Sequence, residues 1–268
     1  MDVRKTYKLF VNGEFVRSES GRAYRPDGNV NVPRGSRKDM RDAVRAARSA
    51  LAGWAGRTAM NRGQILYRAA EMLDGRGGEF IELLGGGARA RRELEQAVET
   101  LVWYAGWTDK LSQFTGTVNP VAGPYFNFTI PEPTGVVGIV APEDAPLAGL
   151  VRRLAPALCG GNVVVALAAE THPLAALTLG EVLATSDVPA GVVNIISGQR
   201  KELLPWLAAH MDVNAIDVAG CTSDEIKAIE ELAAGNVKRV IKVTEAERSP
   251  YLIAAFMEMK TVWHPIGV

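Results

Sequence analysis

The sequence predicts an α/β protein, in which an open parallel sheet with flanking helices follows a helical N-terminal segment and a β arm. Three observations indicate this class. Short apolar runs rich in β-branched residues recur in the second half of the chain, and amphipathic stretches of helical length separate them. The first half has long stretches with apolar residues at helical spacing. Between the halves, Pro and Gly punctuate alternating aromatic residues, as in an exposed or edge strand.

The N-terminal elements begin with a hairpin. Two short strand-like runs in YKLFVNGEFV flank Asn12-Gly13, the strongest short-range hairpin signal. A helix follows, for which Ser36 with Asp39 makes a plausible start. Residues 57–84 then predict one or two helices broken at 75–78, and residues 85–114 predict a third long helix after a glycine break.

Strands and helices alternate after the arm. We expect strands at 136–141, 163–167, 192–196, 213–218 and 237–243, and helices at 146–158, 173–185, 201–210 and 222–234. The chain therefore divides into an N-terminal hairpin with helices (1–116), a β arm (117–133) and an α/β core (134–268), which together form one compact unit.

Composition argues against several classes of function. The 268 residues contain 30 Lys plus Arg and 30 Asp plus Glu, so nothing electrostatic favours nucleic acid or an acidic membrane as a partner. Cys159 and Cys221 cannot build a disulfide framework, and the start has no apolar signal core, so we expect a cytoplasmic protein. No stretch is long enough to span a bilayer.

Ligands of an open parallel sheet bind beyond the carboxyl ends of its strands, where helix N-termini offer N–H groups to phosphate. After the first core strand come Glu143 and Asp144, which we interpret as acids that cap the next helix and would repel a pyrophosphate. After the second comes Glu170. It could accept a hydrogen bond from a ribose hydroxyl or be an acid at a helix start, and both interpretations stay open.

The third and fourth turns offer fewer ligand groups. Gly198 is followed by Gln199, Arg200 and Lys201, whose cations could attract phosphate but are more often solvated. At the fourth turn, next to Gly220, the Cys221 thiol could be reactive at a helix N-terminus, but a lone cysteine without a nearby histidine is more often inert. Neither glycine-based phosphate fingerprint occurs, and the sequence predicts no metal site. The histidines are scattered, and two of them are expected on the surface (His172 and His210; the third is His264).

Several stretches stand in a recognisable order: LFVNGEFV, YAGWTDKL, EPTGVVGIVAP, LAPALCGGNVVV and VPAGVVNIISG. Together they resemble the N-terminal, cofactor-binding half of the aldehyde dehydrogenase superfamily, over nearly the whole chain. The resemblance implies a Rossmann-like domain, NAD(P) as the cofactor, and an oligomerisation arm that would include PYFNFTIPEP.

The sequence departs from that family at its functional motifs. The family motif Pro-Trp-Asn-x-Pro corresponds to residues 142–146 of this chain, where Asp144 takes the place of the asparagine. In the family that asparagine helps to stabilise the oxyanion of the substrate. A carboxylate would repel the oxyanion instead. Lys-Pro-Ser-Glu, which holds the adenosine ribose, keeps only Glu170. Gly-Ser-Thr-x-x-Gly stands as residues 220–225, with Glu225 in place of the second glycine.

The motif of the general base is altered as well. Glu-Leu-Gly-Gly-Lys-Ser-Pro stands as residues 244–250, so Thr244 falls at the general base position and Glu245 lies one place away, on the other face of a strand. The catalytic positions are thus degenerate (Asp144, Thr244 and Glu245), and the cofactor contacts that the resemblance implies are Pro142, Glu170, Gly198, Gly220 and Cys221. The acidic replacements argue against an ordinary pyrophosphate pose of NAD(P).

The end of the sequence leads to three further expectations. It stops at Val268, before the family's catalytic cysteine domain would begin, and neither Cys159 nor Cys221 matches the catalytic thiol. The strand that closes the family's arm is expected to be missing. The apolar, aromatic tail 251–268 either folds back on its own domain or is covered by a partner, and both remain open.

Three functions are compatible with the sequence. The one we adopt is a catalytically inactive aldehyde dehydrogenase-like protein that acts as a subunit or regulator of a full-length aldehyde dehydrogenase, in a mixed assembly or alternatively a homo-oligomer. The second is NAD(P)-dependent aldehyde dehydrogenase activity, through Cys221 or a thiol supplied in trans. The third is a stand-alone module that binds a nucleotide or another small molecule.

Overall fold

The main sheet confirms the predicted α/β class. The computed structural model describes residues 5–26, 30–243 and 248–267. Seven strands lie in the order β11-β10-β7-β8-β9-β1-β2. The parallel strands are β7 (Val136–Val140), β8 (Val163–Leu167), β9 (Val193–Ile196), β10 (Ala215–Asp217) and β11 (Arg239–Ile241). At one edge β1 (Leu9–Val11) and β2 (Glu14–Val16) pair antiparallel. Every residue of β7 and β8 is buried, which explains their continuous apolar runs.

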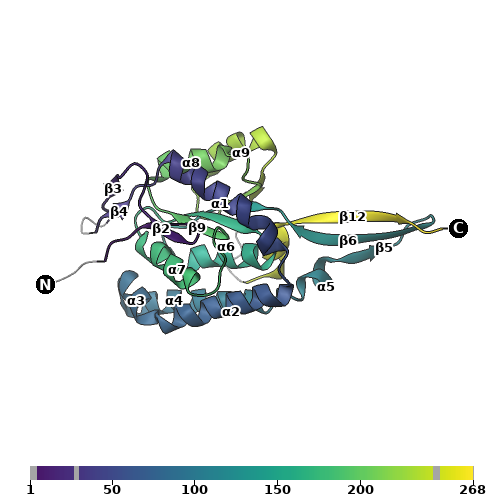
Figure 1. The fold of residues 1–268 in the computed structure, drawn as a ribbon, viewed down its shortest axis with the longest axis horizontal. Coiled ribbons are helices and arrows are strands. Elements are labelled where there is room, and N and C mark those ends of the chain that lie inside the picture. The colour runs from purple at the N-terminus through teal and green to yellow at the C-terminus, as the bar shows by residue number, and fades with distance from the viewer. Residues whose placement is uncertain (1–4, 27–29, 244–247, 268) are drawn as a thin grey trace.

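Helices cover both faces of this sheet (Figure 1). One face carries α1 (Arg37–Ala55), α8 (Arg200–Ala209) and α9 (Ser223–Ala233). The other carries α6 (Ala148–Cys159) and α7 (Leu174–Ala184), with α2 (Ala59–Gly75), α3 (Gly77–Leu83) and α4 (Gly87–Ala105) packed outside them. Among the described residues, no helix is long and apolar enough to cross a membrane.

The N-terminal predictions hold with one exception. Asn12 and Gly13 form the hairpin turn with φ angles of 55° and 75°, and Ser36 with Asp39 forms a capping box at the start of α1. The single long helix expected at 85–114 is instead α4 and α5 (Leu111–Thr115), because the chain leaves the helix at Gly106. Two short strands, β3 (Ala23–Tyr24) and β4 (Val32–Pro33), form a separate pair.

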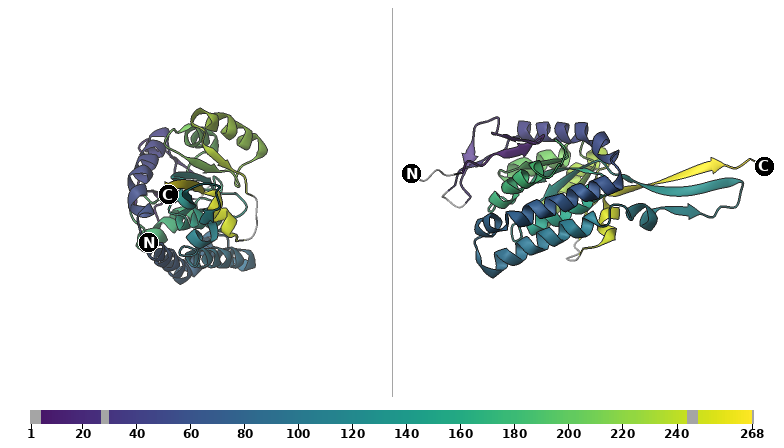
Figure 2. Two further views of the ribbon diagram at one scale, coloured as in Figure 1. Left: turned by 90° about the vertical axis from the view of Figure 1, so that its right-hand side faces the viewer. Right: turned by 60° about the horizontal axis from the view of Figure 1, so that its bottom comes forward.

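The arm is a three-stranded antiparallel sheet that extends away from the body (Figure 2). It consists of β5 (Thr117–Asn119), β6 (Tyr125–Pro133) and β12 (Met257–Pro265), in the order β12-β6-β5. After α10 (Pro250–Ala255) the tail enters β12, which pairs with β6 at nine successive positions. The expectation of a missing closing strand is therefore wrong, and the tail, assigned above to the core, folds back on the chain's own arm.

Candidate functional site

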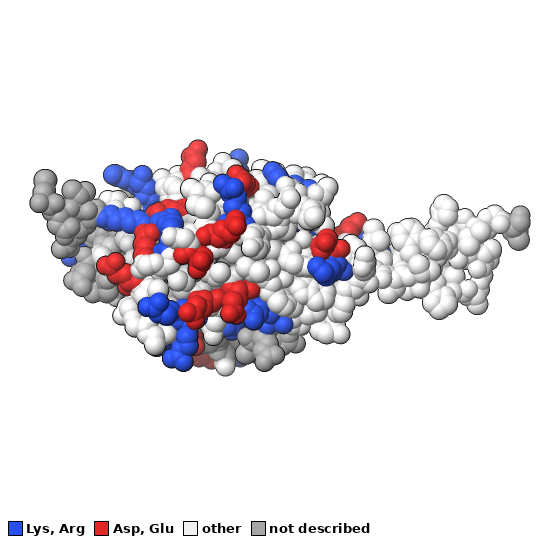
Figure 3. All heavy atoms as spheres, turned by 90° about the horizontal axis from the view of Figure 1, so that it is seen from below, with Lys and Arg blue, Asp and Glu red and all other residues white. Residues whose placement is uncertain are grey.

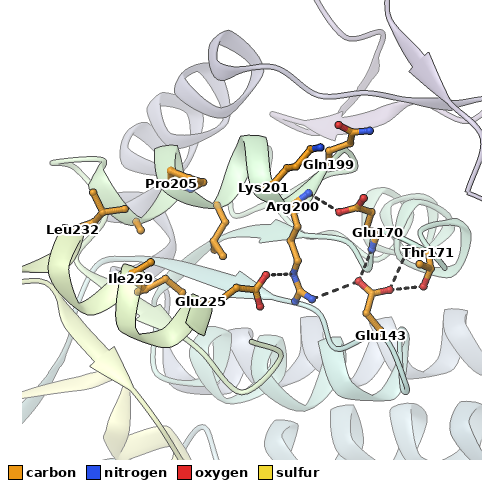
Figure 4. Close-up of a pocket in the computed structure, with 13 residues that line it drawn as sticks. Glu143, Glu170, Thr171, Gln199, Arg200, Lys201, Pro205, Glu225, Ile229 and Leu232 are labelled. Atoms are coloured by element: carbon orange, nitrogen blue, oxygen red, sulfur yellow. Dashed lines mark hydrogen bonds and ion pairs between the residues drawn. The ribbon is translucent and has the colours of Figure 1, made fainter. Parts of the chain in front are cut away.

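A cavity of about 520 Å³ opens between α8 and α9, at the carboxyl ends of the parallel strands (Figure 4). Its walls are apolar and come from both helices: Leu204, Pro205 and Ala208 from α8, and Ala228, Ile229 and Leu232 from α9. Its inner end is charged (Glu143, Glu170, Arg200 and Glu225). Since β7 lies between β8 and β10, the strand order reverses here, where open α/β sheets bind ligands.

Arg200, the first residue of α8, bridges the turns that follow β7 and β10. Its Nη2 donates to the carbonyl of Ala141 at 3.2 Å and to the carbonyl of Gly220. Its Nη1 lies 3.5 Å from Glu143 Oε1, and its Nε lies 3.5 Å from Glu225 Oε1. Only 13% of the side chain is exposed. Arg200 therefore has a structural role, and the expectation that its guanidinium would be solvated is wrong.

Glu143 binds the turn that follows β8. Its Oε1 accepts from the backbone N–H of Glu170 at 2.7 Å, and its Oε2 accepts from the backbone N–H and the hydroxyl of Thr171 at 3.0 and 2.5 Å. Burial alone would raise the pKa of the Glu143 carboxyl. The hydrogen bonds from Thr171 and Glu170, together with nearby Arg200, hold that pKa below its usual value instead. The carboxylate is thus charged and held in place.

Interpreting Glu143 and Asp144 as caps of α6 is wrong. The N–H groups of Leu147 and Ala148, at the start of α6, donate to Glu93 Oε1 at 2.9 and 3.2 Å. Glu93 lies on α4, 54 residues before Leu147, and nothing in the local pattern points to it. Asp144 itself is exposed, and its backbone carbonyl accepts from Arg89.

Carboxylates also occupy both helix starts that border the cavity. Glu170 Oε2 accepts from the backbone N–H of Arg200 at 2.7 Å, so Glu170 is an acid at a helix start, but the helix is α8 and not its own α7. Glu225 Oε2 accepts from the backbone N–H of Thr222 at 2.8 Å and completes a capping box for α9. The N–H groups that phosphate would use are already bound by the chain's own acids.

The predicted cofactor positions other than Glu170 do not line this cavity. A Cβ at Gly220 would collide with the backbone of Val140 and Pro142, so this glycine lets two turns approach closely. A Cβ at Gly198 would lie 2.7 Å from Leu203 and 3.1 Å from the backbone of Gly35. At these positions the structure shows close backbone packing.

The two cysteines lie in environments that suppress the thiolate. Cys221 is half-buried, and burial raises its pKa to about 12 despite the nearby Arg200 guanidinium. Cys159 is buried within α6, where burial likewise raises its pKa to about 12. The other predicted positions, Thr244 and Glu245, lie outside the described residues.

The dinucleotide that the resemblance implies does not fit the residues present. The apolar slot suits a flat ring, and Glu170 Oε1, which accepts no hydrogen bond from the described residues, can accept from ribose hydroxyls. A diphosphate would instead meet Glu143 and Glu225, where the helix N-terminus is already capped. Among the described residues, no group of three or more His, Cys, Asp or Glu side chains could hold a metal ion.

Comparison with known proteins agrees with this architecture. The sequence matches the aldehyde dehydrogenase family over residues 24–260. It is 35% identical to mouse (Mus musculus) retinal dehydrogenase 2 over 94% of this chain and 51% of that protein. It is 34% identical to cytosolic 10-formyltetrahydrofolate dehydrogenase of Xenopus tropicalis, over 94% of this chain and 30% of that protein. The chain spans about half the length of the retinal dehydrogenases that it matches.

Solved structures show the same relationship. The NAD+ complex of an aldehyde dehydrogenase from Bacillus cereus superposes with a TM-score of 0.81 and 28% identity, over 88% of this chain and 50% of that one. HpcC from Thermus thermophilus also gives 0.81, with 30% identity, over 88% of this chain and 47% of that one.

Proposed function

This chain belongs to the aldehyde dehydrogenase family, and on that premise we propose that it is a catalytically inactive member that acts as a subunit or regulator of a full-length aldehyde dehydrogenase. The observation that carries the proposal is the arm, which keeps an exposed apolar face. The charged inner end of the cavity is the second support.

One face of the arm is apolar across all three strands. Residues directly opposite in the register share a face, and residues two apart on a strand share it too. The apolar arm face therefore consists of Val118, Phe126, Phe128, Ile130 and Val262, and the register adds Lys260 opposite Ile130 and His264 opposite Phe126 at its two ends. Val118 is 68% exposed, and the arm is almost free of charged side chains on the side seen in Figure 3. Contiguous exposed apolar surface of this kind marks a protein interface.

The opposite face is polar along the middle of the arm. Asn119 donates to Asn127 Oδ1 at 2.6 Å and to the Thr129 hydroxyl at 2.9 Å. The Thr129 hydroxyl lies 3.1 Å from that of Thr261, on the neighbouring strand. Apart from Asn127 Nδ2, which has no hydrogen-bond partner among the described residues, these groups satisfy one another, so the middle of this face has less to gain from a partner. The outer end of this face carries the exposed Tyr125 and Trp263, so the two faces differ along the middle of the arm, where Val262 and Thr261 make a matched pair.

The family relationship favours an aldehyde dehydrogenase as the partner. The resemblance implies that this arm is an oligomerisation arm, and such an arm should bind a chain of the same family.

The cavity supports the second part of the proposal, that this chain catalyses no reaction itself. Glu143, Arg200 and Glu225 fill the end where a cofactor diphosphate would bind, and both thiols are held protonated. We also propose a cytoplasmic location, which the two unpaired cysteines support.

Native mass spectrometry of the protein, purified gently from its own cells, tests the assembly. We expect a complex that contains this chain and a longer aldehyde dehydrogenase chain. Val262→Lys, on the apolar arm face, should abolish the complex, whereas Thr261→Lys, one residue earlier and on the polar face, should preserve it.

Two results would contradict the proposal. A monomer or a homo-oligomer of this chain alone would remove the partner. Oxidation of an aldehyde with NAD(P)+ by the isolated chain, lost on replacement of Cys221 by Ser, would show that it is an enzyme.

A further inference from the structure

We propose that a cavity between α1 and α8 binds an amphiphilic carboxylate, a molecule in which one anionic group is joined to an apolar chain. The two helices lie side by side on the same face of the sheet (Figure 1). The cavity has a volume of about 550 Å³ and shares no lining residue with the cavity between α8 and α9. The proposal does not depend on the assembly role.

Most of the lining surface is apolar. Met40 lies at the start of α1, Trp206 and Ala209 lie on the last turns of α8, and Met211 follows that helix. Trp206 is 42% exposed and Met211 is 67% exposed, so two large apolar side chains meet water at this one cavity. An apolar chain bound here would remove that surface from water, which is favourable. Methionine side chains adapt to irregular shapes, so these walls suit a flexible chain.

The charged side chains that line the cavity are all cationic (Arg37, Lys38 and Arg41). Two of them already have an acidic partner outside the lining: Lys38 Nζ lies 3.1 Å from Glu19 Oε2, and Arg41 Nη2 lies 2.9 Å from Asp42 Oδ1. Arg37 has no hydrogen bond or ion pair with any residue that the structure describes. This single cation matches the one charge of a carboxylate better than the two charges of a phosphate monoester.

The Trp206 ring holds Arg37 at the cavity. The guanidinium carbon of Arg37 lies 4.1 Å from the centroid of that ring, close enough for a cation–π interaction. An arginine held in this way keeps its N–H donors for a ligand, and two of them can bind both oxygens of a carboxylate. The same ring thus positions the cation and forms part of the apolar wall, so both ends of the ligand find a partner beside Trp206.

His210 supplies a further donor to the cavity. Its Nδ1 accepts from the backbone N–H of Asp212 at 3.2 Å. Burial lowers the pKa of the imidazole, with Lys238 and Arg48 acting in the same direction and Asp212 against it, so at pH 7 the ring is neutral and carries its proton on Nε2. The backbone carbonyl of His210 is bound by Lys238 Nζ at 2.8 Å and does not face the ligand as a free acceptor. These groups favour an acceptor such as a carboxylate.

Isothermal titration calorimetry of the full chain with octanoate, 1-octanol and acetate at pH 7 tests the proposal. We expect one octanoate per chain, bound roughly tenfold or more tightly than the other two, because 1-octanol lacks the charge and acetate lacks the chain. Equal binding of 1-octanol or acetate would overturn the proposal. A folded chain that does not bind octanoate, or that takes it up without saturation, would overturn it too.

A variant of Arg37 tests the contact with the anion. Arg37→Gln should weaken octanoate binding roughly tenfold. Arg45→Gln is an equal loss of charge at an exposed residue two turns further along α1 that does not line the cavity, and it should leave the affinity unchanged. An unchanged affinity in Arg37→Gln would overturn the proposal, and so would equal weakening in the two variants.

Two matched substitutions distinguish this cavity from the one between α8 and α9. Ala209→Trp places a large ring in the cavity between α1 and α8 and should abolish octanoate binding. Ala228→Trp places the same ring in the other cavity and should preserve binding. Binding that survives Ala209→Trp, or that is lost only in Ala228→Trp, would place the ligand elsewhere and overturn the proposal. Circular dichroism of each variant establishes that it is folded.

Discussion

The most unusual single residue of the core is Asp217, at the end of β10. Its side chain is completely buried, with Oδ1 accepting from the N–H of Ala219 at 3.0 Å and lying 3.7 Å from Arg153 Nε. Among the described residues, Asp217 Oδ2 and Arg153 Nη1 have no hydrogen-bond partner. Burial raises the pKa of Asp217 from 3.8 to about 6, although Arg153 and the Ala219 N–H act in the opposite direction. The pair is thus incompletely satisfied.

This residue predicts a measurable pH dependence of stability. Because the folded state holds the Asp217 proton more tightly than the unfolded state, the stability that it contributes is fully present below pH 3.8 and is lost as the pH rises through about 6. The free energy of unfolding of the wild type, measured relative to Asp217→Asn by urea titration, should fall across this window by roughly 1–3 kcal/mol and stay constant above it.

A control variant distinguishes the effect of burying Asp217 from the effect of removing any one carboxyl group. Asp74→Asn changes an exposed acid on α2, so its difference from the wild type should stay nearly flat over the same window. If the difference in the free energy of unfolding between the wild type and Asp217→Asn also stayed constant with pH, burial would not raise the pKa of the Asp217 carboxyl, and the prediction would be wrong.

Among single residues, the sequence identified three acids that line the candidate cavity, but it did not identify their hydrogen-bond partners. Glu143, Glu170 and Glu225 were identified from their place after strands or at an altered motif, and all three lie at the cavity. Their hydrogen-bond partners could not be predicted from neighbouring residues. Glu143, after β7, binds the backbone of the turn after β8, and Glu170, after β8, binds the backbone N–H at the start of α8. Glu93 was missed because its contact with α6 joins residues 54 positions apart.

Among the short elements, the turn between α9 and β11 holds a strained residue. Val237 has φ 55° and ψ 35°, a left-handed conformation that a β-branched residue rarely adopts, and it is 92% exposed. The next residue explains the turn, since Lys238 Nζ donates to the carbonyls of His210 and Val213 at 2.8 and 2.6 Å. Packing of Lys238 therefore fixes the conformation of its neighbour.

Replacing Val237 by Gly should stabilise the protein. The left-handed conformation costs about 1–2 kcal/mol for a residue with a Cβ, and the entropy of the glycine in the unfolded chain offsets part of the gain, so we expect a net increase of roughly 1 kcal/mol in the free energy of unfolding. Chemical denaturation measures it. Met211→Gly, at an exposed turn residue without a positive φ, should give no such increase, and a loss of stability in Val237→Gly would refute the strain.

The elements themselves were largely predictable, because their signals are local. The Asn12-Gly13 turn, the Ser36 cap and the β-branched runs at 136–141 and 163–167 each correspond to an observed element. The strand at 257–265 was not predicted, because its partner β6 lies more than 120 residues earlier and a free tail shows no sign of it. Only the assembled sheet shows that the two belong together.

At the scale of the whole molecule, the body and the arm are stabilised by different contacts. The body has a continuous apolar core, whereas most of β12 is exposed and is paired with β6. The junction between them lies at Phe256 and Met257, which are buried, and at Arg239, which binds Glu258 at 2.8 Å. We therefore expect the outer part of the arm to add little to the stability of the body.

Ending the chain after Met259 tests this division of roles. The truncation removes the outer part of β12 but leaves Phe256, Met257 and Glu258 in place, so the midpoint of thermal unfolding should fall by no more than a few degrees. The proposed assembly with a longer aldehyde dehydrogenase chain should be lost, since β6 would have no neighbour on that side and the apolar arm face would lose Val262. Far-UV circular dichroism and native mass spectrometry measure the two effects on the same sample. A large fall in the unfolding temperature would mean that the arm supports the body, and assembly that survives the truncation would mean that the partner binds another surface.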